Sequence, residues 1–224
     1  MKPIRLVCFS PESFDLKRLG DALPSASNYI FFDLETTSLL STCHIIQLAS
    51  YFQGSTFNRY VIPKEEIDRR ASAKNGLTFV DGQLFHHDRK KQAIPIKQCL
   101  EEFLAWLERL AGNGKVTLVG HNSKQFDAPR FVRAVKGNGL LPRLMQVVHR
   151  FADTLPLFRE LYRGELTRFN LPALVKSLMN GEAYGAHNAR EDAKVLAKLV
   201  EKVGVTEVQL DQFSFSLESV VQKL

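Results

Sequence analysis

Cysteine is scarce in this sequence, and long hydrophobic runs are absent. The three cysteines, Cys8, Cys43 and Cys99, form no CxxC pair, which disfavours both a disulfide framework and a zinc knuckle. No stretch approaches the roughly 20 apolar residues that a membrane-spanning helix needs, and the apolar run near the N-terminus is too short for a secretory signal. We therefore expect an intracellular protein, in the nucleus or the cytoplasm, without membrane association.

Low-complexity tracts and internal repeats are also absent. With 224 residues, of which 45% are hydrophobic and 24% charged, the composition is that of a soluble globular protein with one sizeable domain. We expect an N-terminal extension at residues 1–27 with a candidate strand at Ile4–Phe9, a domain at 28–204 and a C-terminal tail at 205–224. The net charge of +6 makes a polyanion such as nucleic acid a candidate partner, but many basic proteins bind none, so charge alone does not identify the partner.

The hydrophobic pattern predicts strands first and then an alternation of strands with helices. Short apolar runs indicate five strands, at 29–35, 45–52, 58–62, 116–119 and 147–152. Apolar residues at steps of three and four predict helices at 100–110, 128–136, 155–161, 171–179 and 189–203. This order implies an α/β domain with a central five-stranded mixed sheet flanked by helices. The alternating segment Phe213–Leu217 lies beyond it and could be a docking segment or an extra packed strand or helix.

Two acids end the first predicted strand. Asp33 and Glu35 are two residues apart, so in a strand both carboxylates leave the same face. A bound cation would relieve their repulsion, and hard oxygen ligands suit Mg²⁺ or Mn²⁺. The alternative is a strand that runs into a solvated turn with both acids exposed.

Two later segments place acids in comparable positions. Asp127 lies between a predicted strand and a predicted helix, where it is also a natural N-cap before an Ala-Pro pair. Asp192 falls one turn inside the helix at 189–203, on its inward side, where an acid needs a partner or a metal. His187 precedes it by five residues and fits a loop better than the same helical face. Taken alone, it could equally be a surface histidine.

Together these residues resemble the motifs of the DEDDh branch of the DnaQ-like 3′-to-5′ exonucleases. Phe31–Leu39 is similar to the first motif, Gly120–Asp127 to the second, and His187–Asp192 to the third. The sister branch has a tyrosine four residues before the last acid, where this chain has Asn188. Within the family, the chain looks most like the three-prime repair exonucleases and the exonuclease-like domain associated with the promyelocytic leukaemia protein. It lacks the proline-rich insertion of some repair exonucleases.

The resemblance implies a ribonuclease-H-like fold and metal-dependent hydrolysis of phosphodiesters. The metal ligands would be Asp33, Glu35, Asp127 and Asp192, for two Mg²⁺ ions that Mn²⁺ can replace. His187 would be the general base that accepts the proton of the attacking water. The substrate would be a single-stranded or frayed 3′ end, with DNA favoured over RNA, and the product a nucleoside 5′-monophosphate.

The same resemblance suggests four substrate contacts. Backbone around Thr36 would approach the terminal nucleotide, Leu39 and Leu77 would wedge against the last bases, and Phe126 would line the site. Core packing is the alternative for each of them.

Two basic groups could track phosphates or simply form solvated surface: Arg89–Lys91, and the helical set Arg130, Arg133 and Lys136. The segment Lys74–Thr78 is similar to a substrate-loop segment of the family.

Two hypotheses of different classes follow. The first is an active 3′-to-5′ exonuclease, and the second is a catalytically silent nucleic-acid-binding or protein-interaction module on the same fold. All five motif positions are filled, which favours the enzyme, because a silent copy is expected to have lost at least one ligand. A helix-turn-helix binder has no support in the sequence. The choice between DNA and RNA stays open, as does formation of a homodimer.

Overall fold

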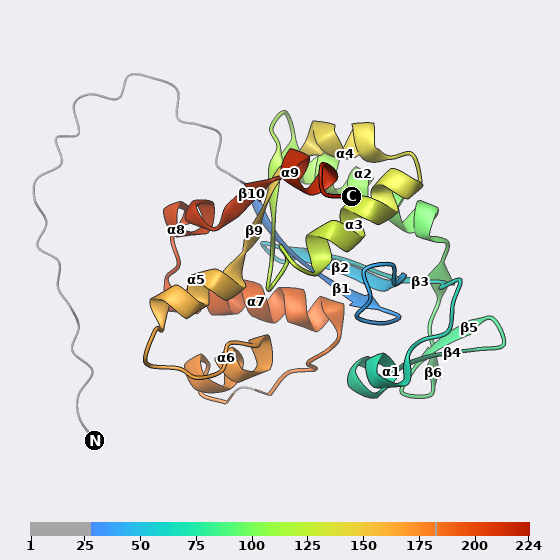
Figure 1. Ribbon diagram of the computed structural model, residues 1–224, viewed down its shortest axis with the longest axis horizontal. Coiled ribbons are helices and arrows are strands. Elements are labelled where there is room, and N and C mark those ends of the chain that lie inside the picture. Colours follow the sequence, from blue (N-terminus) through green and yellow to red (C-terminus); the bar gives the residue numbers. More distant parts are fainter. Residues whose placement is uncertain (1–27, 182) are drawn as a thin grey trace, which may run out of the picture.

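The computed structural model describes residues 28–181 and 183–224, so the predicted extension and its candidate strand Ile4–Phe9 lie outside the described residues. In the described part, a large mixed sheet lies between two layers of helices, and a small antiparallel sheet stands to one side (Figure 1). This is the α/β architecture that the sequence predicts.

The large sheet has seven strands in the described part of the chain, in the order β10-β9-β8-β1-β2-β3-β7. Their bounds are β1 (Asn28–Thr36), β2 (Ile45–Phe52), β3 (Ser55–Val61), β7 (Ala93–Ile94), β8 (Val116–Gly120), β9 (Val148–Asp153) and β10 (Ser214–Ser216). β1, β8 and β9 are parallel, whereas β2 runs antiparallel to both β1 and β3. The five predicted strands form the centre of this sheet. The two strands at its edges, β10 and β7, were not predicted as part of it.

Helices cover both faces of this sheet. One face carries α2 (Ile96–Ala111), α3 (Asp127–Gly137), α4 (Leu141–Val147) and α9 (Leu217–Val221). The other carries α5 (Thr154–Leu161), α6 (Leu171–Leu178), α7 (Ala189–Val203) and α8 (Glu207–Gln212). All five predicted helices are present, and α7 has the predicted bounds.

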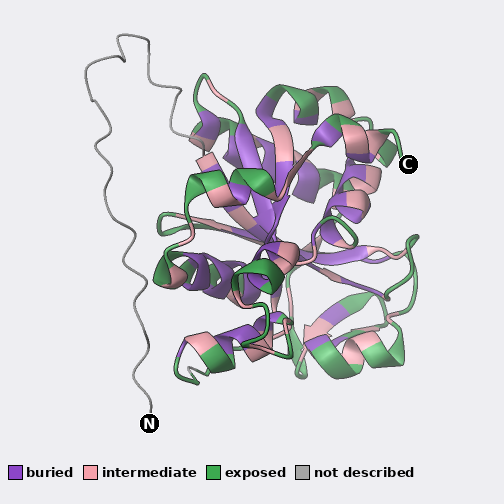
Figure 2. Cartoon of the chain, turned by 60° about the vertical axis from the view of Figure 1, so that its left-hand side comes forward, coloured by how far each residue is buried: buried purple, intermediate pink, exposed green. Residues whose placement is uncertain are grey.

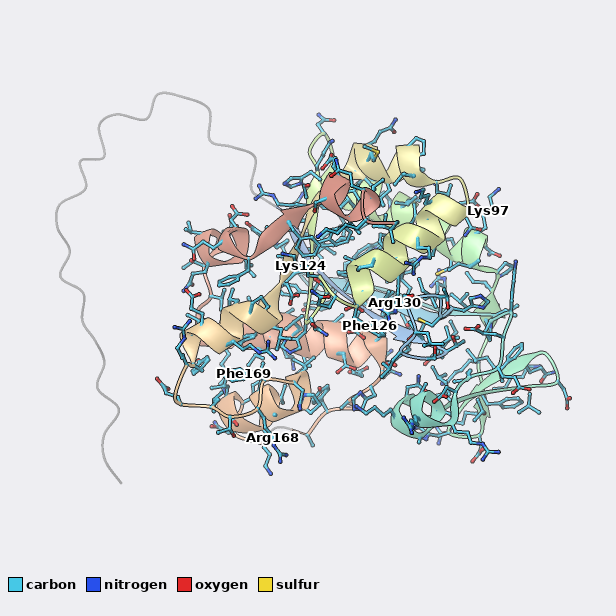
Figure 3. All side chains as sticks on the ribbon, in the orientation of Figure 1. Lys97, Lys124, Phe126, Arg130, Arg168 and Phe169 are labelled. Carbon is cyan, nitrogen blue, oxygen red and sulfur yellow. The ribbon has the colours of Figure 1, made fainter. Side chains whose placement is uncertain are left out.

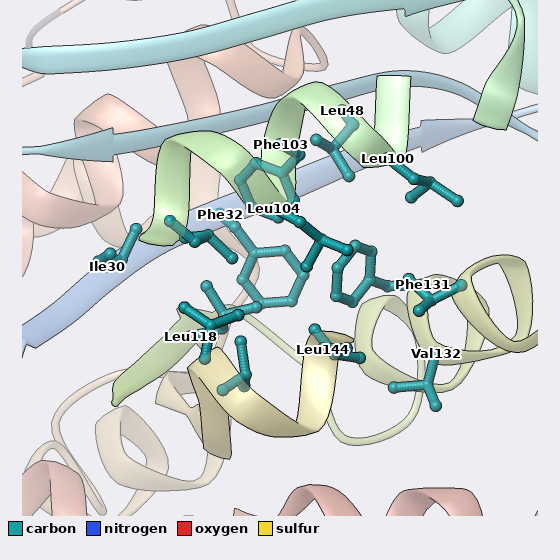
Figure 4. Close-up of a cluster of buried hydrophobic side chains, with 14 of the residues drawn as sticks. Ile30, Phe32, Leu48, Leu100, Phe103, Leu104, Leu118, Phe131, Val132 and Leu144 are labelled. Carbon is teal, nitrogen blue, oxygen red and sulfur yellow. The ribbon is translucent and has the colours of Figure 1, made fainter. Parts of the chain in front are cut away.

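The core on the α2 side is aromatic and aliphatic (Figure 4). Phe32 of β1 lies 6.2 Å from Phe131 of α3, ring centre to ring centre, and Phe103 of α2 meets Phe131 edge-on at 5.6 Å. All three rings are fully buried. Burial of each such side chain stabilises the fold by about 1.5–3 kcal/mol, so this cluster fixes β1 against α2 and α3.

A smaller unit lies beside the large sheet. It consists of α1 (Arg69–Asn75), β4 (Leu77–Val80), β5 (Gln83–His86) and β6 (Arg89–Lys90). α1 ends at Gly76, whose φ of 67° is left-handed, and a Cβ there would lie 2.4 Å from the His87 ring. The unit is mostly exposed or half-buried, whereas the large sheet is mostly buried (Figure 2).

The segment that the sequence sets apart as a tail, 205–224, joins the large sheet. β10 runs antiparallel to β9, and the rings of Phe215 and Phe151 stack with their centres 5.6 Å apart. Leu217 is fully buried. Among the alternatives for Phe213–Leu217, the structure therefore has the extra packed strand, followed by a helix.

Cys43 and Cys99 are free thiols. None of the helices in the described ranges is both long enough and apolar enough to cross a bilayer.

Candidate active site

The carboxylates of Asp33, Glu35 and Asp192 lie together where β1 meets α7. One carboxylate oxygen from each lies within 4.8 Å of the others. Alternation along β1 sends Phe32 and Leu34 into the core on the α2 side, so Asp33 and Glu35 leave the opposite face, which α7 covers. Asp192 is only 7% exposed, as an inward-facing helical acid would be.

A cavity of about 320 Å³ opens over these carboxylates and brings in the other two motif residues. Asp127 lines it from the first turn of α3, and His187 lines it from the segment before α7. All five motif residues therefore meet in one cavity, although they come from three distant parts of the chain.

Three of the four predicted substrate contacts also line this cavity: Thr36, Leu39 and Phe126. Leu39 is 82% exposed, as a side chain that contacts a ligand would be. Leu77 is placed elsewhere, because it is 1% exposed and packs with Ile46 and Leu84. The expected wedge contact of Leu77 is therefore wrong in this structure, and the core-packing alternative holds.

Burial raises the pKa values of the four carboxyls, and repulsion between neighbouring acids adds to it. Burial, followed by the charges of its three acidic neighbours, raises the pKa of Asp33 well above its ordinary value. Burial likewise raises the pKa of Glu35 to about 8, that of Asp127 to about 7 and that of Asp192 to about 6. A cation would relieve this repulsion, and a donor set made only of carboxylate oxygens fits Mg²⁺ or Mn²⁺.

Hydrogen bonds orient the carboxylates from neighbouring elements. Asn75, the last residue of α1, donates through Nδ2 to Oε2 of Glu35 over 3.3 Å. The backbone N–H groups of His187 and Asn188 bond to Asp192, and that of Leu34 bonds to Asp127. The small unit thus supplies a positioning residue, from within the segment that resembles the family's substrate loop.

His187 occupies a left-handed position, with a φ of 63°, just before α7. The next residue, Asn188, caps α7 through a hydrogen bond that its side chain accepts from the backbone N–H of Arg190. Burial and the nearby charge of Lys74 lower the pKa of His187 below its ordinary value. The imidazole is therefore neutral at pH 7 and able to accept a proton.

The loop that carries the second motif is fixed by a buried acid that the sequence analysis missed. Asp153 accepts hydrogen bonds from the backbone N–H groups of Asn122, at 2.9 Å, and Lys124, at 3.0 Å. His121 is bonded on both ring nitrogens, to Thr154 and to the carbonyl of Phe169, so it serves packing. An acid at the end of a strand, directly before a helix, is the signal that could have identified Asp153.

Arg130 was also missed, because its helical spacing with other basic residues indicated a solvated face. It is only 7% exposed, and its guanidinium carbon lies 3.7 Å from the centre of the Phe126 ring (Figure 3). Its Nη2 donates to the carbonyls of Leu39, at 2.6 Å, and Leu40, at 3.0 Å. Arg130 thus fixes both the aromatic wall and the apolar rim of the cavity.

Replacing Arg130 with methionine is expected to lower the free energy of unfolding by about 2–4 kcal/mol, or roughly 5–15 °C in Tm, because the hydrogen bonds of a buried guanidinium to three backbone carbonyls are lost. Lys136→Met is the matched control, since Lys136 is exposed on the same helix. Thermal unfolding of both variants tests this, and equal Tm values would show that Arg130 does not hold the rim.

Tyr184 is a third residue that the motifs did not indicate. Its buried hydroxyl lies close to the carboxylate of Asp192. Burial and the charge of Asp192 raise its pKa, so the phenol stays protonated at neutral pH. Tyr184 is therefore a neighbour of the acid Asp192 and is not among the residues that line the cavity.

The fold of this chain is ribonuclease-H-like, and E. coli exonuclease I shares it. The zinc-bound complex of E. coli exonuclease I with single-stranded DNA matches with a TM-score of 0.63 at 19% identity, over 82% of this chain and 42% of that chain. The complex of the same enzyme with a dA16 oligonucleotide matches with a TM-score of 0.62 at 20% identity, over 83% and 42% of the two chains. At this identity, the match establishes the fold alone.

The chain belongs to the Exuperantia RNAse H-like domain family, whose model matches residues 28–178. The maternal protein exuperantia of Drosophila melanogaster is 27% identical over 145 residues, which are 59% of this chain and 27% of that protein. The Drosophila virilis protein is 24% identical over 186 residues, or 78% and 37% of the two. The chain thus spans only about a third of the length of these relatives. The motifs alone did not distinguish this family from the two subgroups named above.

Proposed function

We propose that this chain is a metal-dependent 3′-to-5′ exonuclease of the DEDDh type, which releases nucleoside 5′-monophosphates from single-stranded or frayed 3′ ends. The observation that carries the proposal is the convergence of Asp33, Glu35 and Asp192 within 4.8 Å, with Asp127 and His187 on the same cavity. These acids form no ion pair with a described residue, and a buried set of unpaired acids is costly to keep unless it binds cations. DNA is the favoured substrate, and RNA is the alternative.

The acidic residues would hold two divalent ions, Mg²⁺ with Mn²⁺ as a substitute. Such ions stabilise the negative charge that builds up on the attacking and leaving oxygens. His187, neutral at pH 7, would accept the proton of the attacking water. It lines the same cavity but is not one of the three residues whose ligand atoms lie within 4.8 Å of one another, so it can act as a base beside the metal ligands.

The rim residues would hold the terminal nucleotide. Leu39, at 82% exposed, and Leu40, at 69%, present apolar surface to a base, and the Phe126 ring forms an adjoining wall. Contacts of this kind accept any base, because every base has an apolar face. The Thr36 side chain is bonded to the carbonyl of Ser38 at 2.7 Å, which leaves its backbone to approach the sugar.

Degradation of matched 5′-labelled single-stranded DNA and RNA tests the proposal. With Mg²⁺ or Mn²⁺, a ladder of products shortened from the 3′ end is expected, and EDTA should stop it. Full-length substrate after long incubation with both metals would overturn the proposal. A difference in rate between the two substrates decides between DNA and RNA.

A catalytically silent nucleic-acid-binding module is the second candidate. It is favoured by the relatives, whose names, maternal protein exuperantia, describe no reaction. This module would retain oligonucleotides without shortening them, whatever metal is present.

The metal-free protein is expected to lose thermal stability as the pH rises. Unfolding returns the four carboxyls to ordinary pKa values near 4, whereas the folded state raises them, that of Glu35 to about 8. The folded state therefore binds more protons than the unfolded state between about pH 4 and 8, and stability falls through that window. Mg²⁺ replaces the protons, so its stabilising effect should be larger at pH 8 than at pH 5.5.

Scanning fluorimetry with Mg²⁺ and with EDTA measures this effect. Glu35→Gln should flatten the upper part of the pH dependence, because the group whose pKa is about 8 is removed. A Mg²⁺-induced shift in Tm that is the same at every pH would contradict the arrangement.

A further inference from the structure

A second cavity, of about 390 Å³, lies beside the acidic one. The two share Lys74 and Asn75 as a common wall. The segment before α7 separates them, since His187 lines the acidic cavity while Ala186 and Asn188 line the second. The rest of the lining comes from β3, the small sheet and the start of α7. At this size, the cavity can accept part of a ligand whose other part occupies the acidic site.

The lining of the second cavity is basic. Lys74, Lys91 and Arg190 contribute cations, and Glu191 is the acid among the residues around it. Glu191 is already paired, with Oε1 2.6 Å from Nη2 of Arg190. Neither Lys74 nor Lys91 forms an ion pair with a described residue. The lining therefore has an excess of positive charge, in contrast to the acidic site next to it, although Lys74 at the common wall also acts on Glu35.

Lys91 is held in place within this cavity. Its ammonium lies 5.5 Å from the centre of the Tyr60 ring, and its side chain is half-buried, whereas the preceding Lys90 is exposed. The rings of His86 and His87 lie 4.3 Å apart on the same wall. Burial first, and then the nearby charges of His87 and Lys91, lower the pKa of His86.

Phosphate is the anion that fits this location. A strand whose 3′ end lies in the acidic cavity carries a phosphate at every nucleotide, and the backbone must leave that cavity past its walls. Lys74 stands at the wall that both cavities share, and Lys91 stands beyond it. Asn75 and Asn188 add amide groups that can bond to phosphate oxygens.

We propose that the second cavity is a phosphate subsite, in which Lys91 and Lys74 bind a backbone phosphate of the nucleic-acid strand whose 3′ end occupies the acidic cavity. This inference rests on the proposed function, because it takes the acidic cavity as the place of the 3′ end. Of the basic cluster Arg89–Lys91, only Lys91 would then contact the substrate, while Arg89 and Lys90 lie on the exposed surface.

Adjacent lysines supply a matched pair of variants, Lys91→Ala and Lys90→Ala. Both remove one positive charge from the end of β6 or the residue that follows it, but only Lys91 lines the cavity. Binding of a 5′-fluorescein oligodeoxythymidylate of about 12 nucleotides is measured by anisotropy in EDTA between about 50 mM and 200 mM salt. Lys91→Ala should weaken binding about 3- to 10-fold and reduce the salt slope by about 0.7, the value for one phosphate of a single strand. Lys90→Ala should change the affinity by less than about twofold.

Two further measurements keep the test specific. Lys91→Arg, which retains the charge above Tyr60, should restore most of the affinity, and equal Tm values for the variants exclude a folding defect. Binding of thymidine 5′-monophosphate and of inorganic phosphate is measured separately, to test whether the cavity holds a free or terminal phosphate. The affinity for thymidine 5′-monophosphate should be the same in Lys91→Ala and the wild type, because a mononucleotide has no upstream phosphate.

Equal effects of the two alanine variants would overturn the subsite. An equal loss of affinity for the oligonucleotide and the mononucleotide would also overturn it, because the cavity would then hold a free or terminal phosphate. The outcome is separable from that of the proposed function. If Lys91→Ala weakens binding but the wild type does not shorten the oligonucleotide, the phosphate subsite stands and the exonuclease proposal fails. If the wild type shortens the oligonucleotide but Lys91→Ala does not weaken binding, the exonuclease proposal stands and the subsite fails.

Discussion

Replacing Asp33 with asparagine is expected to lower the rate of 3′-end removal by more than about 100-fold while raising the Tm of the metal-free protein. Loss of a ligand should cost at least as much as the 10- to 100-fold typical of residues that only orient ligands. Asparagine keeps the shape of aspartate but carries no charge, so it also ends the repulsion that raises the pKa of Asp33. Single-turnover cleavage and scanning fluorimetry in EDTA measure the two effects.

Loss of a ligand lowers the cleavage rate but raises the Tm, whereas a damaged fold would lower both the cleavage rate and the Tm. Asp81→Asn is the matched control, because Asp81 is an exposed acid at the β4–β5 turn. Its φ of 50° is a conformation that asparagine also adopts readily. Cleavage by Asp33→Asn at the wild-type rate would rule out Asp33 as a ligand.

Replacing His187 with asparagine is expected to lower the rate about 10²- to 10⁴-fold, the range for loss of a general base, and to leave metal binding intact. Asparagine is chosen because the φ of His187 is 63°, a left-handed conformation that asparagine adopts more readily than alanine. Cleavage rates and the Mg²⁺-induced shift in Tm are the two measurements.

The pH dependence of the rate adds a second test of the same role. Burial and Lys74 lower the pKa of His187, so the wild-type rate should rise with pH through a value below the ordinary 6.5 of histidine. This rise of the rate with pH should be absent in the His187→Asn variant. Loss of the Mg²⁺-induced Tm shift in this variant would instead make His187 a ligand and contradict its role as base.

The four acidic motif residues could be placed from the sequence because each lies on an element with a strong pattern, whereas His187 lies in the segment before α7. Asp33 and Glu35 end a strand whose other face is apolar, and Asp192 lies on a helix whose bounds the periodicity gave correctly. Local alternation and helical spacing are sufficient to fix which face these side chains leave. The carboxylates of Asp33, Glu35 and Asp192 meet once α7 packs against β1.

Leu77 shows where such reasoning stops. Its position in the chain resembles the substrate loop of the family, but α1 and β4 turn its side chain into a cluster with Ile46 and Leu84. The small sheet has short strands with mixed exposure, and β7 has two residues, so neither shows a hydrophobic period. The direction of a side chain in such elements depends on tertiary packing.

Arg130 illustrates a second limit, which concerns charge. A basic residue at helical spacing with other basic residues is typical of solvated surface, yet Arg130 is buried under the rim. Its hydrogen bonds go to the carbonyls of Leu39 and Leu40, about 90 residues away in sequence. Backbone acceptors leave no pattern in the sequence, so only the fold could reveal this role.

The measurement that addresses the proposed activity most directly is identification of the product. Wild-type protein incubated with Mg²⁺ and a single-stranded oligonucleotide should release nucleoside 5′-monophosphates in order from the 3′ end, and the Asp33→Asn variant should release almost none. Tight binding of the oligonucleotide with no mononucleotide detected by mass spectrometry, in Mg²⁺ and in Mn²⁺, would contradict the exonuclease and leave a binding module on the same fold.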